Sequence, residues 1–367
     1  RAEGIILFPQ PGKGVVNGKQ IHRTFPVNPT QPITAWGLIG VGIRAYDHMD
    51  GVGNRYGVHT VILEVDGEEV FRSVVDRFAY EENRYINSWT HGQYMKSFIE
   101  PGNRLRMLHA SNGNRGLVEI NEERPYRFVY TLSDALGNTS KVRFTVQGKN
   151  TEIHPVEHRE KYAFKWDRTN YLQEPGLELV VPRGMLYDDV WLDYSVRADS
   201  GDVAFTYQLH NKRVPLHGAC EMRIGLRRDR LEDKSKYYVA GVTARGGKYS
   251  IGGTYEDGFM KVRIRDLGTY TVAVDTVPPE IIPLNPGQWG RTGRITLKAK
   301  DKETGINSYR GTIDGKYALL GKPNSISGNL VCELDPKHVK KGGRHTVEMT
   351  VTDGRGNRTT EEFHFVW

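Results

Sequence analysis

The sequence YTLSDALGNTSKVRFTV at residues 130–146 returns in altered form as MTVTDGRGNRTTEEFHFV at residues 349–366. In both copies an Asp-x-x-Gly-Asn segment stands between two runs in which apolar residues alternate with polar ones. Gly and Asn tolerate positive φ, and an Asp side chain accepts hydrogen bonds from nearby backbone, so this segment is typical of a tight turn. Each stretch is therefore predicted to be a β-hairpin. Because so short a hairpin is not stable alone, two copies predict two similar β-sandwich domains, each ending with this hairpin.

An element upstream of the hairpin repeats as well. The sequence IRAYD at 43–47 resembles LKAKD at 297–301, and each is followed by a strand pattern and an Asp-Gly turn, at Asp66 and at Asp314. Between that turn and the hairpin aspartate the first copy is 29 residues longer than the second. We assign the additional residues to an aromatic-rich insert near 78–105. Repeats this far apart in one chain indicate duplicated modules.

The composition favours a β protein of several domains. The chain has 367 residues, of which 38% are hydrophobic, with 41 Gly and 17 Pro, and this length predicts two or three domains. No run of 18 apolar residues occurs, so we expect no transmembrane segment. Arg1 is not an initiator methionine and no signal-peptide pattern follows it, so we expect a processed chain or part of a longer protein.

The net charge is +7, but the Lys and Arg residues are mostly interleaved with acids. This pattern is typical of a solvated surface, and no nucleic-acid-binding signature accompanies it. We therefore expect no nucleic acid as a partner. A basic surface would favour an anionic polymer of the cell envelope over a neutral one.

Two segments divide the chain. Residues 149–158 are polar, unpatterned and contain a proline, which is typical of a linker, and DTVPP at 275–279 is a stiff, extended junction. We therefore predict an all-β protein of three tandem β-sandwich domains, at 1–148, 159–274 and 277–367. The first and last are expected to be immunoglobulin-like, and the second, which lacks the repeated hairpin, is expected to have a different topology.

The insert supplies the candidate binding residues. Exposed aromatic rings combine apolar area with a polar tip, which suits a surface that binds sugars or peptides. The alternative is that these rings cap the sandwich and fill its open edge. A helical turn is expected around 90–97. The candidate binding residues are Tyr80, Tyr85, Trp89 and Tyr94.

The twelve histidines do not occur in a zinc-binding pattern such as H-E-x-x-H or H-x-H. His154 and His158 are four residues apart, but Pro155 argues against a helix that would present both. Asp188 and Asp189 are adjacent, so on a strand their side chains would point to opposite faces, which is wrong for a pair of acid–base catalysts. We therefore name no catalytic residue and no metal ligand in this chain.

Matching loops hold Asp47, Asp50, Asp301 and Glu303, which either bind calcium or, as we favour, cap turns. The two cysteines, Cys220 and Cys332, lie in different predicted domains. We expect them to be buried thiols without a disulfide.

Several further strings resemble those of a known family. The chain resembles the non-catalytic C-terminal region of large zinc metallopeptidases of the lysostaphin type from Bacteroidetes-like bacteria. The resemblance covers nearly the whole chain. The strings that carry it are GVVNG at 14–18, GIRAYD at 42–47, YGV at 56–58, VDG at 65–67, FRSVVD at 71–76, ENRYINS at 82–88, KSFIEPGN at 96–103, DTVPP at 275–279 and SYRGTIDGK at 308–316.

In that family an N-terminal domain binds zinc through H-x-x-x-D and H-x-H motifs and cleaves peptide cross-links of peptidoglycan. This sequence carries neither motif, so the resemblance implies that zinc and catalysis belong to a peptidase domain of the parent protein. The chain itself is expected to be a non-enzymatic scaffold, without a cofactor, that positions or docks that domain in the periplasm or cell envelope. Its expected partners are its own peptidase domain and peptidoglycan or another envelope glycan. The alternative is a carbohydrate- or peptidoglycan-binding module that uses the aromatic insert.

Overall fold

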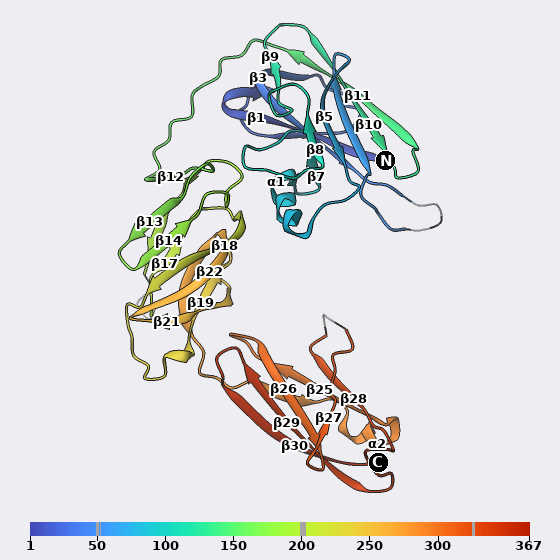
Figure 1. Ribbon diagram of the computed structural model, residues 1–367, viewed down its shortest axis with the longest axis vertical. Coiled ribbons are helices and arrows are strands. Elements are labelled where there is room, and N and C mark those ends of the chain that lie inside the picture. The colour runs from blue at the N-terminus through green and yellow to red at the C-terminus, as the bar shows by residue number, and fades with distance from the viewer. Residues whose placement is uncertain (49–50, 52, 199–202, 325–326) are drawn as a thin grey trace. The chain divides into compact units, whose positions relative to one another are not determined.

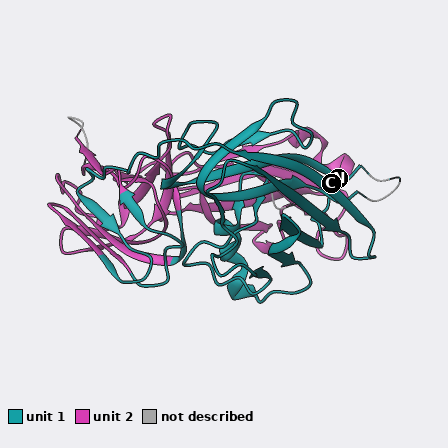
Figure 2. Ribbon diagram, turned by 90° about the horizontal axis from the view of Figure 1, so that it is seen from above, with its two compact units in different colours: residues 1–170, 182–191, 215–218 teal, residues 171–181, 192–214, 219–367 magenta. Residues whose placement is uncertain are grey.

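The computed structural model describes residues 1–48, 51, 53–198, 203–324 and 327–367. Regular structure in this part of the chain is almost entirely β-strand, with helices limited to short turns (Figure 1). This confirms the all-β, multidomain sandwich class. The chain forms two compact units, residues 1–170, 182–191 and 215–218, and residues 171–181, 192–214 and 219–367 (Figure 2). The three domain boundaries stay a prediction.

The first module, which we define as strands β1–β11, forms one sheet of eleven strands. Its main order is β2-β1-β3-β11-β10-β4-β5-β8, with β7 and β9 also paired to β3 and β6 paired to β7. The strands are β1 (Ala2–Val16), β2 (Arg23–Phe25), β3 (Ile33–Ala45), β4 (Thr60–Val65), β5 (Glu68–Val74), β6 (Thr90–His91), β7 (Tyr94–Lys96), β8 (Leu108–Ala110), β9 (Val118–Ile120), β10 (Pro125–Ser133) and β11 (Thr139–Gly148).

Strand β1 is longer than its sequence indicates. The apolar run GIILFP at 4–9, which ends in a proline, predicts a short strand that ends at Pro9, but β1 continues to Val16, so the predicted length is wrong. Pairing with β3 resumes at Gly14 after a register shift between Pro9 and Gly14, because an irregularity of this kind accommodates a proline without ending the strand.

The last module, which we define as strands β24–β30, is a sandwich of a three-stranded sheet β24-β25-β28 and a four-stranded sheet β27-β26-β29-β30. The order β27-β26-β29-β30 repeats the order β5-β4-β10-β11 of the first module, which confirms the predicted duplication. In the first module, a short parallel pairing of β11 with β3 joins the strands β2-β1-β3 to the strands β11-β10-β4-β5-β8, so that they form one sheet. The strands are β24 (Glu280–Pro283), β25 (Arg294–Lys300), β26 (Ile306–Ile313), β27 (Lys316–Ala318), β28 (Asn329–Glu333), β29 (Arg344–Asp353) and β30 (Arg358–Val366), with the short helices η3 (Pro286–Gln288) and α2 (Trp289–Thr292) after β24.

The middle module, which we define as strands β12–β23, has a different topology, as expected. Its two five-stranded sheets are β13-β14-β18-β22-β21 and β16-β17-β23-β19-β20, and β12 pairs with β15. The strands are β12 (Tyr162–Phe164), β13 (Asn170–Glu174), β14 (Leu177–Val181), β15 (Val190–Leu192), β16 (Ser195–Arg197), β17 (Thr206–Gln208), β18 (Val214–Gly225), β19 (Tyr237–Val242), β20 (Lys248–Gly252), β21 (Thr254–Glu256), β22 (Phe259–Leu267) and β23 (Thr269–Val274), with the short helix η2 (Lys234–Lys236) before β19.

The repeated turn has the same hydrogen bonds in both copies. The Asn138 backbone N–H donates to Asp134 Oδ1 at 2.9 Å, and its side-chain Nδ2 donates to Asp134 Oδ2 at 2.7 Å. The same two bonds join Asn357 to Asp353, also at 2.9 and 2.7 Å. Gly137 and Gly356 take the positive φ that the turn requires, at 89° and 76°.

The upstream Asp-Gly turn also makes the same backbone hydrogen bond in both copies. Asp66 Oδ1 accepts from the Arg127 backbone N–H at 2.8 Å, and Asp314 Oδ1 accepts from the Thr346 backbone N–H at 3.0 Å. Each aspartate therefore links a turn, β4–β5 or β26–β27, to the first residues of the neighbouring hairpin strand, β10 or β29.

Apolar side chains of alternating strand positions fill each core. The first core includes Phe71, Phe128 and Tyr130, and the last includes Trp289 and Met349, all of them buried. The two cysteines are buried, free thiols, which confirms the expectation from sequence.

The two hairpin aspartates give a matched test of the turn. Asp353 is 1% exposed, so Asp353→Ala leaves the backbone donors of Arg355 and Asn357 without an acceptor in a buried turn. Each buried donor without an acceptor costs about 1–3 kcal/mol, so we expect the opening free energy of β29 and β30 to fall by about 2 kcal/mol or more. Hydrogen–deuterium exchange of the two strands measures this loss.

The control is Asp134→Ala, which removes the same hydrogen bonds from a more exposed turn and should accelerate exchange of β10 and β11 less. Equal effects in both hairpins would show that burial does not decide the strength of the turn.

Candidate functional site

The aromatic insert contains two short helical turns and a small hairpin. Helix η1 (Tyr80–Tyr85) leads directly into α1 (Ile86–Trp89), and β6 and β7 follow. The prediction of a helical turn at 90–97 is therefore wrong, because the helical turns lie before residue 90 and strands follow. Gly92 has a positive φ of 58° between β6 and β7, which favours a hairpin turn there, while Glu82 Oε2 accepts from the Ala79 backbone N–H at 2.8 Å and starts the helix earlier.

The four candidate binding residues have different environments. Trp89 is only 7% exposed, and its Nε1 donates to the Lys96 carbonyl at 3.1 Å, so its ring packs in the core and presents no binding surface. Tyr94 is half-buried against Gly4, where a Cβ would lie 2.9 Å from the tyrosine hydroxyl. Tyr80 is 91% exposed and remains available to a ligand.

Tyr85 is half-buried and belongs to a cluster of three rings that we call the ring cluster, with Tyr187 and His217. The Tyr85 ring stacks on the His217 imidazole with centroids 4.0 Å apart, and it meets the Tyr187 ring edge-on at 6.0 Å. All three residues lie in the first compact unit. The ring of Tyr85 is thus engaged within the chain, as the packing alternative predicts.

Arg84 reinforces the ring cluster through the backbone. Its Nε and Nη2 both donate to the Leu216 carbonyl, at 3.0 and 2.7 Å, and its own carbonyl accepts from the Tyr187 hydroxyl at 2.6 Å. The insert therefore contacts segments 182–191 and 215–218 through the hydrogen bonds of Arg84 to Tyr187 and Leu216 and through the stacked ring of Tyr85.

The electrostatics keep this cluster neutral. Burial, and then the nearby Arg84 guanidinium, lower the pKa of His217 below its ordinary value, so the stacked imidazole is uncharged at neutral pH. Burial raises the pKa of Tyr187 to about 12, so its hydroxyl stays protonated and donates. Sequence reasoning missed Tyr187 and His217 because they are more than 100 residues from Tyr85, and no local pattern marks them.

Three carboxylates in the second unit are the arrangement most like a cation site. Asp275, Asp301 and Asp353 place oxygen atoms within 4.8 Å of one another. Carboxylate oxygens suit calcium. All three carboxylates, however, already accept hydrogen bonds from nearby residues: Asp301 Oδ2 accepts from the Thr304 and Gly305 backbone N–H groups at 2.8 and 2.7 Å.

The other two carboxylates have similar partners. Asp275 Oδ2 accepts from the Thr304 hydroxyl at 2.6 Å, and Asp353 accepts from Arg355 and Asn357. Burial, and further the charges of Asp353 and Asp301, raise the pKa of Asp275, while hydrogen bonds from Thr304 and Val277 oppose the shift. The observed capping agrees with the interpretation that we favour for Asp301.

The remaining metal candidates that the structure describes each have hydrogen-bond or ion-pair partners of their own. Asp47 Oδ1 accepts from the His48 backbone N–H at 2.8 Å, Glu303 accepts from the Tyr238 hydroxyl at 2.8 Å, and Asp50 lies outside the described residues. His154 and His158 each lie beside their own glutamate, and the His158 ring stacks on Trp191 with centroids 3.7 Å apart.

Part of the chain matches a known domain family. The model of a Zu5-like domain matches residues 161–275, which corresponds closely to the middle module. No curated protein matches the chain. Within the described residues, no helix is long and apolar enough to cross a membrane.

Solved structures similar to this chain include several adhesins. A 1.5-MDa bacterial ice-binding adhesin is 8% identical, with 90% of this chain and 89% of that chain covered and a TM-score of 0.15. A Ca²⁺-stabilised adhesin of an Antarctic bacterium is 11% identical, with 90% and 93% covered and a TM-score of 0.17. SGBP-B of the Bacteroides ovatus mixed-linkage glucan utilization locus, in complex with a mixed-linkage heptasaccharide, is 10% identical, with 96% and 69% covered and a TM-score of 0.14. Similarity at this level supports no inference about ligand or activity.

The ring cluster predicts that Tyr85 stabilises the segments it contacts. An aromatic pair contributes about 0.5–1.5 kcal/mol beyond its buried area, so Tyr85→Ala should accelerate hydrogen–deuterium exchange in 182–191 and 215–218. Tyr80→Ala is the matched control, because that ring is exposed and should leave the same amides unchanged. If both variants exchange like the wild type, the stacking contributes nothing to this joint.

Proposed function

We propose that this chain is a non-catalytic scaffold region of a cell-envelope metallopeptidase that acts on peptidoglycan, and that it positions or docks the catalytic domain. The observation that carries the proposal is the contact of Arg355, in the repeated turn of the last module, with the middle module. Its Nη1 donates to the Tyr237 carbonyl at 2.9 Å and to the Gly253 carbonyl at 3.0 Å. A side chain with two backbone acceptors in another module restrains that module in position and orientation.

Neighbouring residues support the same role. Lys236 Nζ donates to the Arg355 carbonyl at 3.0 Å, and Tyr238 donates to Glu303, so the contact is reciprocal. Asn357 Nδ2 donates to the Asp275 carbonyl at 3.1 Å, at the start of the proline-containing junction. Burial lowers the pKa of Arg355, while Asp353 and Asp275 favour its charged form. These contacts suit a spacer whose two modules do not move freely.

The insert supports the proposal from the first unit. Its buried Trp89 and its stacked Tyr85 stabilise the chain itself. On this proposal, zinc and bond cleavage belong to a peptidase domain of the parent protein, the chain is located in the periplasm or cell envelope, and its partners are that domain and the envelope glycan.

A second candidate function is binding of carbohydrate or peptidoglycan through the insert. The exposure of Tyr80 and, at 42%, of Phe78 favours it, because these two rings remain accessible. This function needs only the exposed part of the insert and is compatible with the packing of Tyr85 and Trp89.

The scaffold proposal predicts that Arg355 sets the spacing of two modules. Spin labels at Lys248→Cys and Lys337→Cys report the distance between them. The native thiols should not react, because burial raises the pKa of Cys220 to about 11 and also raises that of Cys332. We expect one narrow distance distribution in the wild type and a broader one in Arg355→Ala. The control Arg358→Ala removes an exposed arginine of the same hairpin and should keep the distribution narrow. A broad distribution in the wild type would contradict the proposal.

Incubation of the purified chain with insoluble peptidoglycan tests the chemistry. We expect no released peptides in the supernatant and no stoichiometric zinc on the protein by mass spectrometry, because the proposal assigns both to another domain. Stoichiometric zinc together with peptide release would overturn it.

The protein retained in the peptidoglycan pellet tests the second candidate function. Retention that Tyr80→Ala abolishes would support binding by the insert, and unchanged retention would exclude Tyr80 from the binding surface.

A further inference from the structure

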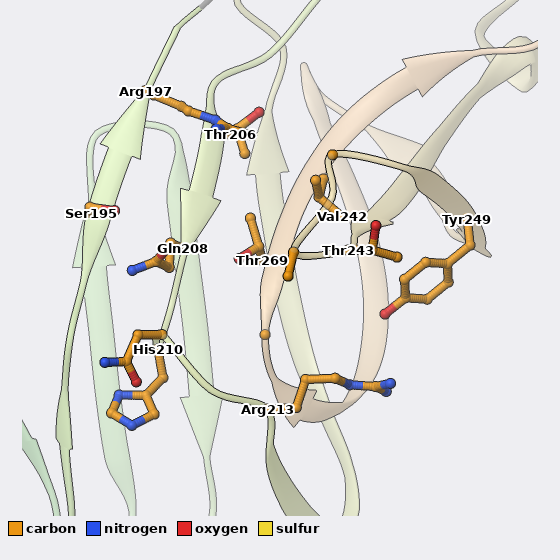
Figure 3. Close-up of a pocket in the computed structure, with 14 residues that line it drawn as sticks. Ser195, Arg197, Thr206, Gln208, His210, Arg213, Val242, Thr243, Tyr249 and Thr269 are labelled. Carbon is orange, nitrogen blue, oxygen red and sulfur yellow. The ribbon is translucent and has the colours of Figure 1, made fainter.

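A polar groove lies on the face of the sheet β16-β17-β23-β19-β20 in the middle module (Figure 3). It has a volume of about 580 Å³, within the range of sites that take small ligands. All of the described residues that line it belong to the second compact unit.

The strand period explains why this face is polar. On β17, Tyr207 is fully buried, and Gln208, which points to the opposite face, lines the groove. The strand register then places Gln208 beside Ser195 of β16 on one side and Thr269 of β23 on the other. These three side chains form a polar row across three strands. Neighbouring strands are about 4.8 Å apart, which is close to the length of one hexopyranose unit.

The groove is also basic. Its lining includes Arg197 and Arg213 and, among the described residues, no carboxylate (Figure 3). Arg213 Nη2 forms an ion pair with Asp266 Oδ2 at 2.5 Å, but its side chain is 71% exposed. A guanidinium has five N–H donors, so this pair leaves donors for a ligand.

An aromatic ring lies at the far side of the groove from β16. Tyr249 of β20 packs across Gly241 of β19, where a Cβ would lie 2.2 Å from the tyrosine Cζ. Only glycine permits this close approach, and the ring is still 39% exposed. It therefore presents a fixed, partly open surface on which an apolar ring face can stack.

We propose that this groove binds an anionic oligosaccharide, with carboxylate-bearing sugars as the ligand class. The row Ser195, Gln208 and Thr269 supplies hydrogen bonds to hydroxyl groups at a spacing that suits successive sugar units. Arg197 and Arg213 pair with carboxylates, for which a planar guanidinium is the best-matched side chain. Tyr249 stacks on a sugar ring. This site is separate from the insert and from the contacts of Arg355, so it goes beyond the scaffold role and does not depend on it.

Calorimetric titration of the full chain with a short oligogalacturonate tests the proposal. We expect saturable binding that weakens as salt is added. The double variant Arg197→Ala/Arg213→Ala should bind at least roughly tenfold more weakly, and Tyr249→Ala should also weaken binding. The control Lys141→Ala/Arg143→Ala removes the same charge from exposed residues of β11 and should bind like the wild type. Circular dichroism verifies that each variant is folded.

Other outcomes would overturn the proposal. A neutral cello-oligosaccharide of the same length that binds as tightly would refute the anionic class. Equal weakening by the β11 control would show that the net charge acts and the groove does not. Unchanged binding by a folded Arg197→Ala/Arg213→Ala variant, or no binding by the wild type, would remove the groove as the site.

Discussion

The hydrogen bonds between an aspartate and the asparagine four residues later hold the turn on which both immunoglobulin-like modules depend. The carboxylate accepts from the backbone and side chain of the asparagine, while the glycine between them takes a left-handed conformation. This turn aligns the two last strands of each module, and the neighbouring strands add to that hairpin in the same order in both copies. A local constraint of five residues thus fixes the register of a sheet, because a slip by one residue would move every core side chain to the solvent face.

The two copies use the same turn in different surroundings. Asp134 is partly exposed, whereas Asp353 and Asn357 are buried where the last module meets the middle one. In the second copy the turn residue Arg355 donates to two carbonyls of the middle module. A turn that only closes a hairpin in one copy therefore also joins two modules in the other. The duplication conserved the local geometry, and the environment added the second role.

The insert shows the same relation between a local pattern and a distant partner. Its density of aromatic residues indicates a surface that contacts another molecule or another part of the chain, and the structure shows that three of the four candidates, including Tyr94 beside Gly4, are engaged within the chain. Trp89 fills the core, and Tyr85 stacks on His217. Tyr80 is the one of these four rings that is fully presented to solvent. The groove on the middle module, in contrast, has a single aromatic residue among the described residues that line it, and no sequence motif marks it, since these residues come from strands and loops between 195 and 269.

Local sequence determined the β class, the hairpins, the Asp-Gly turns and the duplication, because each of these depends on residues within a few positions of one another. The residue preferences of turns and the two-residue period of strands can both be recognised in such short segments. Only the tertiary structure decided that β1 continues past Pro9, that Trp89 is buried, that Tyr85 meets His217, and that Ser195, Gln208 and Thr269 form one row. These features depend on strand pairing and on contacts between residues far apart in the chain. A single sequence carries no local signal for them, because the free energy that selects them is gained only when the distant partners pack.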